Sequence, residues 1–444
     1  MAGSRRPIAV ELFAGAGGTS LGFEQAGFDV AAAVEIDPIH AAVHSFNFPR
    51  CATLARSVVG LTGRQIREAA GLGDVPVDVV VGGAPCQGFS LIGHRVLDDP
   101  RNRLVLDFVR IVAELDARYF VFENVKGLTV GAHKQFLIEL IEAFKERGYN
   151  VTLPWSVLNA AHYGVPQDRQ RLILMGAKKG LRLPEYPRPH TSIPAERRPP
   201  ALDLPRVTTC AEALADLPNA DDFEGLWQKD ETSVQDWSPA LSKYAREMRC
   251  LSNDAWHFGH PRVWDPSILT ASMRTQHTDI SRRRFDATPG GEVEPISRFF
   301  RLAADGIANT LRAGTDGARG AFTSPRPIHY QHARCITVRE MARLHGFPDW
   351  FRFHVTKWHG ARQIGNAVAP PMARSIAAQV MKAVGLRPTR PREALALGDP
   401  HLLAMNMAEA AAHFGVDVPI TRRDRKSGAK KRKQWEIEAL IAAE

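Results

Sequence analysis

The chain has 444 residues, of which 44% are hydrophobic and 24% are charged, a composition that excludes a disordered protein and allows two domains with sizeable cores. Its five cysteines are too few for a disulfide framework, and no apolar segment is long enough for a signal peptide or a membrane span, so we expect a cytoplasmic protein in a reducing compartment. Most of the formal charge of +9 comes from residues 422–433, which hold eight Lys or Arg and one Asp; this tail either contacts nucleic acid or is a solvated C-terminus.

The chain up to about residue 180 alternates short apolar runs with helical patterns, as doubly wound sheets do. Strands are expected at residues 8–13, 30–35, 77–81, 119–122 and 172–175. Helices are expected from about Thr19 to Gly27, from Asp37 as N-cap, and over residues 133–147. The predicted fold class is α/β, with a doubly wound, mostly parallel sheet.

The composition and the periodicity of the sequence then change three times along the chain. Residues 180–333 are rich in Pro, Arg and polar residues or lack periodicity, which predicts a separate, smaller and irregular domain. Residues 334–388 regain helical patterns, beginning with a capping-box spacing at Thr337 and Glu340, and are expected to complete the first domain, residues 1–179. Residues 389–444 form a basic C-terminal extension.

A glycine-rich loop, Phe13-Ala-Gly-Ala-Gly-Gly-Thr-Ser20, joins the first strand to the first helix, where glycines let a ligand approach the backbone. Glu35 ends the next strand, the place where such sheets put the acid that binds ribose hydroxyls. Ser20 occupies the third glycine position of a dinucleotide fingerprint, so a nucleoside ligand without a pyrophosphate fits better. A tight strand–helix turn without a ligand is the alternative.

Further reactive side chains follow the later strands. Cys86 lies in the Gly/Pro-rich loop Gly82–Ser90 at the carboxyl edge of the sheet; a thiol there needs activation to react, and a buried, inert cysteine is the alternative. Glu123 ends another strand and would face the same edge, unless it only caps a helix or is solvated. Arg169 and Arg171 can point to one side, toward a phosphate or a carbonyl oxygen, or form an ordinary surface pair.

No metal site is expected. The spacing His329-x-x-His332-x-x-Cys335 superficially resembles a metal motif. It lacks a fourth ligand and a second cluster, which a structural zinc site requires.

In this order the motifs resemble those of the DNA cytosine-5 methyltransferase family of prokaryotic restriction–modification systems. The resemblance spans residues 8 to 385, and six motifs in the family's order are highly specific. The matching segments are Phe13-Ala-Gly-Ala-Gly-Gly18, Gly82-Gly-Ala-Pro-Cys-Gln87, Glu123-Asn-Val125, Gln167-Asp-Arg-Gln-Arg171, Arg334-Cys-Ile-Thr-Val-Arg-Glu340 and Gln363-Ile-Gly-Asn-Ala-Val368, with Asp99-Pro-Arg-Asn-Arg-Leu104 as a shorter match.

The resemblance implies a Rossmann-like enzyme that moves a methyl group from S-adenosylmethionine to carbon 5 of a cytosine flipped out of a specific duplex sequence. The Cys86 thiolate would add to carbon 6 of the ring. Glu123 would engage ring nitrogen 3 and the exocyclic amine, while Arg169 would help to hold the carbonyl oxygen and Arg171 would support the site.

The resemblance also implies the binding residues. The cofactor pocket would be lined by Phe13, Gly15, Gly17, Glu35 and Leu104 and closed by Asn366. Residues 180–333 would recognise the DNA target, with DNA contacts from Gln87, Ser90, Thr310 and Leu311. The chain departs from the family at Ser57, where an Asp for the adenine amine is usual, so the adenine contact is open. We expect a monomer that acts on double-stranded DNA in the nucleoid, with a cognate restriction endonuclease as functional partner.

Three other functions compete with this one. A related branch of the family methylates tRNA, but its Cys-Phe-Thr signature is absent and residues 180–333 are long for it. An amino-methyltransferase would need Asn/Asp-Pro-Pro-aromatic where this chain has Ala84-Pro-Cys-Gln87. A catalytically inactive DNA-binding paralogue is disfavoured because the predicted catalytic residues are intact.

Overall fold

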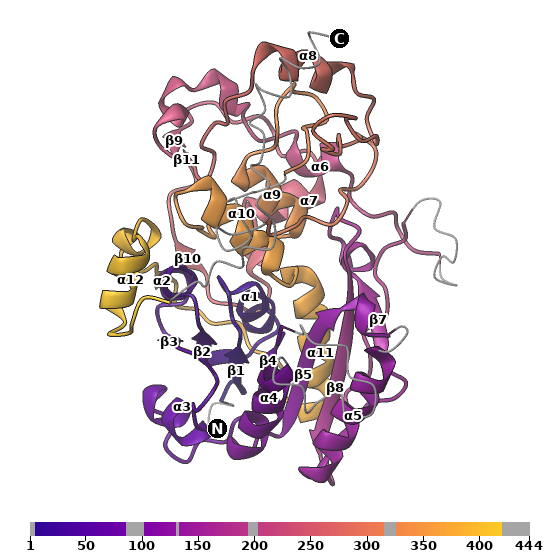
Figure 1. Cartoon of the computed structure of the whole chain (residues 1–444), viewed down its shortest axis with the longest axis vertical. Coiled ribbons are helices and arrows are strands. Elements are labelled where there is room, and N and C mark those ends of the chain that lie inside the picture. Colours follow the sequence, from indigo (N-terminus) through magenta and orange to yellow (C-terminus); the bar gives the residue numbers. More distant parts are fainter. Residues whose placement is uncertain (1–4, 86–101, 130–132, 194–202, 315–325, 420–444) are drawn as a thin grey trace, which may run out of the picture.

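The computed structural model describes residues 5–85, 102–129, 133–193, 203–314 and 326–419, and its first half is a mixed sheet flanked by helices (Figure 1). The strands are β1 (Ile8–Leu12), β2 (Asp29–Glu35), β3 (Ala52–Ala55), β4 (Val79–Gly82), β5 (Tyr119–Val125), β6 (Tyr149–Val151), β7 (Ser156–Asn159) and β8 (Gln170–Lys178). The helices here are α1 (Gly18–Gln25), α2 (Pro38–Asn47), α3 (Gly63–Ala69), α4 (Arg103–Glu114) and α5 (His133–Glu146), with the 3₁₀ turns η3 (Lys126–Thr129) and η4 (Ala160–Tyr163).

The order of the strands confirms the predicted fold class. They run β3-β2-β1-β4-β5-β8-β6, with β7 paired to β8. Strands β1 to β5 are parallel, and β8 is antiparallel to β5. The sheet is therefore mostly parallel, and the carboxyl ends of β1, β2, β4 and β5 share one edge, where doubly wound folds bind ligands.

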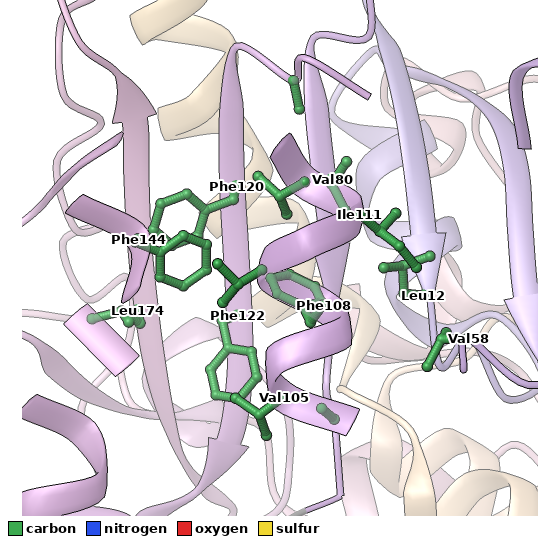
Figure 2. Close-up of a cluster of buried hydrophobic side chains, with 14 of the residues drawn as sticks. Leu12, Val58, Val80, Val105, Phe108, Ile111, Phe120, Phe122, Phe144 and Leu174 are labelled. Atoms are coloured by element: carbon green, nitrogen blue, oxygen red, sulfur yellow. The ribbon is translucent and has the colours of Figure 1, made fainter. Parts of the chain in front are cut away.

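Two apolar layers cover the sheet. Strand β4 reads Val-Val-Val-Gly and is buried throughout, as expected for a parallel strand covered on both faces. On one face Phe108 of α4 and Phe144 of α5 pack against Phe120 and Phe122 of β5 (Figure 2), with the Phe120 and Phe144 rings stacked 3.7 Å apart. Helices α1 and α11 (Pro370–Val384) cover the other face.

The second half of the chain has short elements around a separate core, in agreement with the weak periodicity of its sequence. The elements are α6 (Cys210–Leu214), η5 (Ala220–Asp222), η6 (Glu224–Trp227), β9 (Thr232–Ser233), α7 (Lys243–Met248), η7 (Asn253–Trp256), β10 (Arg262–Val263), β11 (Ile268–Leu269), α8 (Asp279–Ala287), α9 (Val338–His345) and α10 (Lys357–Asn366). The capping box predicted at Thr337 and Glu340 is present at the start of α9. Helices α9 and α10 pack with α6 and α7, so within residues 334–388 only α11 lies on the sheet.

The chain folds further after α11. The elements there are β12 (Leu395–Ala396), the 3₁₀ helix η9 (Pro400–Leu403) and α12 (Met407–His413), and the last of these lies beside α2 (Figure 1). The basic residues 422–433 lie outside the described residues. Among the helices that the structure describes, none combines the length and the apolar character that a membrane crossing requires.

Candidate active site

The carboxyl ends of β4 and β5 bring two predicted motifs together. A Cβ atom on Gly83 would lie 2.5 Å from Oε2 of Glu123, so only glycine lets that carboxylate come so close. The side-chain amide of Asn124 donates to the carbonyl oxygen of Ala84 at 2.8 Å. The loop after β4 is therefore tied to the end of β5 up to the exposed Pro85, the residue that precedes Cys86 in the sequence.

Three predicted site residues cannot be located in the structure. Cys86, Gln87 and Ser90 lie outside the described residues. Their roles stay predictions that rest on the sequence.

Glu123 forms an ion pair with Arg171. The distance from Arg171 Nε to Glu123 Oε1 is 2.8 Å, and the two side chains are 14% and 17% exposed. The antiparallel register places Arg171 opposite Val125, on the same face of the sheet as Glu123. The pair is thus partly accessible at the sheet edge, where it presents both donors and an acceptor to a ligand.

Arg169 has different surroundings. Its guanidinium is 1% exposed and donates to the carbonyl oxygens of Leu311, Gly365 and Ala367 at 2.8–3.0 Å. Burial, with Arg171 nearby, lowers the pKa of Arg169 to about 9. The structure therefore does not turn Arg169 and Arg171 toward one shared target: Arg169 joins β8 to the loop at 311 and to the end of α10.

The Thr310-Leu311 pair docks on the segment that carries Arg169. The Thr310 hydroxyl donates to the carbonyl oxygen of Asp168 at 2.7 Å, and the backbone N–H of Leu311 donates to Gln167 Oε1 at 3.1 Å. Thr310 is exposed, whereas Leu311 is 2% exposed. Sequence reasoning missed Gln167, although it opens the motif that contains both arginines.

The glycine loop and Glu35 meet at the carboxyl ends of β1 and β2, as predicted. The N–H groups of Gly15 and Asp37 donate to the two carboxylate oxygens of Glu35 at 2.8 and 2.9 Å. Burial raises the pKa of Glu35. Gly15 and Gly17 have φ of +55° and +102°, which favour glycine, and Phe13 also has a positive φ of 60°.

The other residues predicted to line or close the cofactor pocket lie in separate elements of the fold. Leu104 is half-buried in the first turn of α4, and Asn366 is exposed at the last position of α10. Ser57 accepts the N–H of Val59, which is a local turn contact. The apolar side chain of Ile36, directly after Glu35, is 59% exposed, a feature that the sequence analysis did not single out.

A buried polar network lies under the glycine loop. The Ser20 hydroxyl donates to Glu11 and lies 3.0 Å from Nε2 of His44, whose Nδ1 lies 3.0 Å from the Thr53 hydroxyl. Burial raises the pKa of Glu11 to about 7 and lowers that of His44 to about 3. Ser20, which breaks the dinucleotide pattern, thus ties α1 to β1, α2 and β3.

Glu11→Gln should change how the stability of the protein depends on pH. The pKa of Glu11 is raised in the folded state, so between pH 4.5 and about 7 the unfolded chain releases a proton that the folded chain keeps, and stability falls as pH rises. The variant, which lacks this titration, should gain stability relative to wild type across that window, by up to about 3 kcal/mol. Denaturant unfolding at pH 5 and pH 8 measures the difference.

The exposed Glu68→Gln serves as a control, because its side chain is 63% exposed. It should follow the wild-type pH profile. A Glu11→Gln profile parallel to wild type between pH 5 and 8 would show that Glu11 is ionised throughout.

The histidine motif considered for metal binding has a local role. Nδ1 of His329 accepts the backbone N–H groups of Gln331 and His332 at 3.0 and 3.2 Å. Within the described part of the chain, no group of three or more His, Cys, Asp or Glu residues is arranged to hold a metal ion. His329 closes a turn.

Comparisons with known proteins agree with this geometry. The model of the C-5 cytosine-specific DNA methylase family matches residues 9–382. The chain is 55% identical to the Type II methyltransferase M.XorII of Xanthomonas oryzae pv. oryzae, over 99% of this chain and 100% of that protein. It is 31% identical to the Type II methyltransferase M1.HphI of Haemophilus parahaemolyticus, over 84% and 86% of the two chains.

A solved structure is similar as well. It is described as a DNA modification methyltransferase encoded within a prophage of E. coli, with a TM-score of 0.68, 33% identity, and coverage of 86% of this chain and all of that one. The family model spans most of the chain, including both halves of the molecule. The chain therefore belongs to the C-5 cytosine-specific DNA methylases and is a DNA (cytosine-5) methyltransferase of the Type II restriction–modification kind.

Proposed function

We propose that this methyltransferase uses S-adenosylmethionine and forms a covalent adduct between Cys86 and carbon 6 of a cytosine flipped out of duplex DNA. The observation that carries the proposal is the Glu123–Arg171 pair, in which Glu123 lies against Gly83, three residues before Cys86 in the sequence. A flipped base needs a partly exposed set of donors and acceptors for its polar edge, and this pair supplies one.

The chemistry assigned to each group follows from cytosine itself. Carbon 5 of the ring is a weak nucleophile, and addition of a thiolate to carbon 6 makes an enamine whose carbon 5 can attack an electrophilic methyl group. The carboxyl group of Glu123 would bind nitrogen 3 and the exocyclic amine and stabilise the ring during addition. Loss of the proton from carbon 5 and β-elimination then release the Cys86 thiolate.

We assign the cytosine carbonyl oxygen to Arg171 and not to Arg169. Arg171 already contacts Glu123 and is partly exposed, so it is the better candidate to hold the cytosine carbonyl oxygen. Arg169 has both terminal nitrogens bonded to backbone carbonyls and is buried. In this proposal Arg169 supports the site by joining three segments around it.

The residues at β1 and β2 fit S-adenosylmethionine. When bound, it supplies a methyl group on a sulfonium centre. The Glu35 carboxylate is held in place by two backbone N–H groups and has lone pairs left for ribose hydroxyls. A Cβ atom on Gly15 would meet nothing within 4 Å, so the backbone of the loop is open to a ligand, and the exposed Ile36 offers an apolar surface to an adenine ring.

Glu35→Ala should weaken S-adenosylmethionine binding by roughly 1.5–3 kcal/mol, the value of a lost charge-assisted hydrogen bond, which corresponds to a Kd about 10- to 150-fold higher. Calorimetric titration of the full-length protein measures the change. Glu68→Ala, which removes an exposed carboxylate from α3, is the matched control and should bind like wild type. Equal affinity of Glu35→Ala and wild type would exclude Glu35 as the ribose acid.

The proposal extends to the biological setting. A specific duplex sequence as target and a cognate restriction endonuclease are inferred from the similarity to Type II methyltransferases. The domain limits 1–179, 180–333, 334–388 and 389–444, with residues 180–333 as the target-recognition region, and a monomer acting on DNA in the nucleoid belong to the same proposal.

Bisulfite sequencing tests the function. Plasmid DNA and tRNA from cells that express the wild-type chain are compared with those from cells carrying the empty vector. New 5-methylcytosine within one short duplex sequence of the plasmid is expected, with tRNA unchanged. Methylation of tRNA alone would favour the related RNA enzymes, and no methylation of either would favour an inactive paralogue.

A further inference from the structure

The segment 393–414, here named the C-terminal strap, lies beyond the residues that match the family model, which end at 382. It begins on the second half of the molecule, where β12 pairs with β10 and the N–H of Leu395 donates to the carbonyl oxygen of Pro261 at 2.8 Å. Glu393 pairs with Arg50, and the N–H of Gly398 donates to Phe46 at the end of α2 at 2.9 Å. The strap thus runs from the second half of the molecule onto α2.

The strap buries an apolar face of α2. Helices η9 and α12 both pack against α2, and α12 lies beside α2 in Figure 1. Leu403 is 2% exposed. The cluster formed here contains Leu402, Leu403, Met405 and Ala410 of the strap, Ile39, Ala42, Val43 and Phe46 of α2, and Ala16 of the glycine loop. The same small core therefore joins the strap to the glycine loop and to α2, the helix that follows Glu35.

The strap also holds the start of α10. The N–H of Val355 donates to the carbonyl oxygen of Leu403 at 3.0 Å. Nε2 of His354 lies 3.0 Å from the carbonyl oxygen of Met405, while Nδ1 accepts the N–H of Thr356 at 3.2 Å. His354 thus donates from Nε2 to the strap, next to the helix that ends at Asn366.

We propose that the strap is a positioning element for the cofactor site, an inference that rests on the function proposed above. Asp37 caps α2 and donates its N–H to Glu35, and Gly15 donates to the other oxygen of the same carboxylate. The position of Glu35 is thus set by the first turn of α2 and by the glycine loop, and the strap packs against both. Loosening the strap should shift these N–H groups relative to the ribose hydroxyls and so weaken cofactor binding.

The test is Leu403→Ala in the full-length protein, with Leu140→Ala as matched control. Leu140 is also fully buried, but lies in α5 against the opposite end of the sheet. Both variants should lose similar stability. Only Leu403→Ala should raise the Kd for S-adenosylmethionine, by about fivefold or more. A displacement of Glu35 much smaller than the size of a side chain is enough to weaken a charge-assisted hydrogen bond. Leu403→Met, which keeps the volume, should restore the wild-type Kd.

A second variant covers the case in which Leu403→Ala does not fold. A Cβ atom at Gly398 would lie 2.8 Å from the Cα of Phe46, so Gly398→Ala should push the strap away from α2 without removing an apolar group, and should raise the Kd as well. If wild type binds S-adenosylmethionine and the folded strap variants bind it like Leu140→Ala, the inference is overturned. If wild type does not bind it, the proposed function itself fails.

Discussion

Cys86→Ala should abolish methyl transfer, lowering kcat by about 10⁴-fold or more, because no other group of the predicted site can supply the nucleophile that activates the ring. The affinity for S-adenosylmethionine should stay within about twofold of wild type, since the predicted cofactor residues lie in other elements of the fold. Transfer of a radiolabelled methyl group to DNA and calorimetric titration of the cofactor measure the two effects.

DNA that carries 5-fluorocytosine at the target base provides a direct readout of the adduct. Fluorine cannot leave as the proton does, so wild type should remain covalently attached to the DNA on a denaturing gel. Cys51→Ala, which removes another free thiol, should still be trapped, whereas Cys86→Ala should not. Substantial turnover by Cys86→Ala would exclude the covalent mechanism.

Glu123→Gln should lower kcat by about 10²- to 10⁴-fold, the usual contribution of a positioned acid or base. The amide keeps the size of the side chain but cannot carry the charge that stabilises the protonated ring. The effect should fall on kcat more than on KM for DNA, because the interaction strengthens in the transition state. Single-turnover methyl transfer at saturating DNA measures it.

The matched control is Glu142→Gln, which removes another ion-paired carboxylate, here bonded to Lys145 and 51% exposed. Its kcat should equal that of wild type. If the kcat of Glu123→Gln lies within about tenfold of the wild-type value, Glu123 is not a catalytic residue.

Local sequence patterns predicted the parts of the fold that have local causes. The apolar runs at 8–13 and 119–122 became β1 and β5, and Asp37 caps α2 with Pro38 behind it. The short strands β3, β6 and β7 were missed, because their three or four residues lack the run of Val residues that marks the equally short β4. The antiparallel direction of β8 depends on distant pairing with β5 and has no local signal.

The site shows the same division. The spacing of Glu35 from the glycine loop is fixed by the strand–helix–strand unit, so their contact through the N–H of Gly15 could be expected from the sequence, while the role of Glu35 in cofactor binding stays a prediction. The spacing of Arg169 and Arg171 predicted one shared direction, whereas the partners of Arg169 come from residues 311–367, far along the chain. The strap lies within residues 389–444, which the sequence predicted only as a basic extension. Its packing has no local signal in the sequence, because Leu403 meets α2 only after folding.

The contacts of Arg169 bear on which substitutions the junction between the two halves of the molecule tolerates. Its acceptors at Leu311, Gly365 and Ala367 are all main-chain oxygens, which any residue provides. Acceptors of this kind constrain the path of the backbone and not the side chains attached to it, except at Gly365, where a Cβ atom would lie 2.3 Å from the backbone nitrogen of Ala313. Side chains near position 311 can therefore change while the junction is kept, as long as Leu311 stays buried and residue 365 stays glycine.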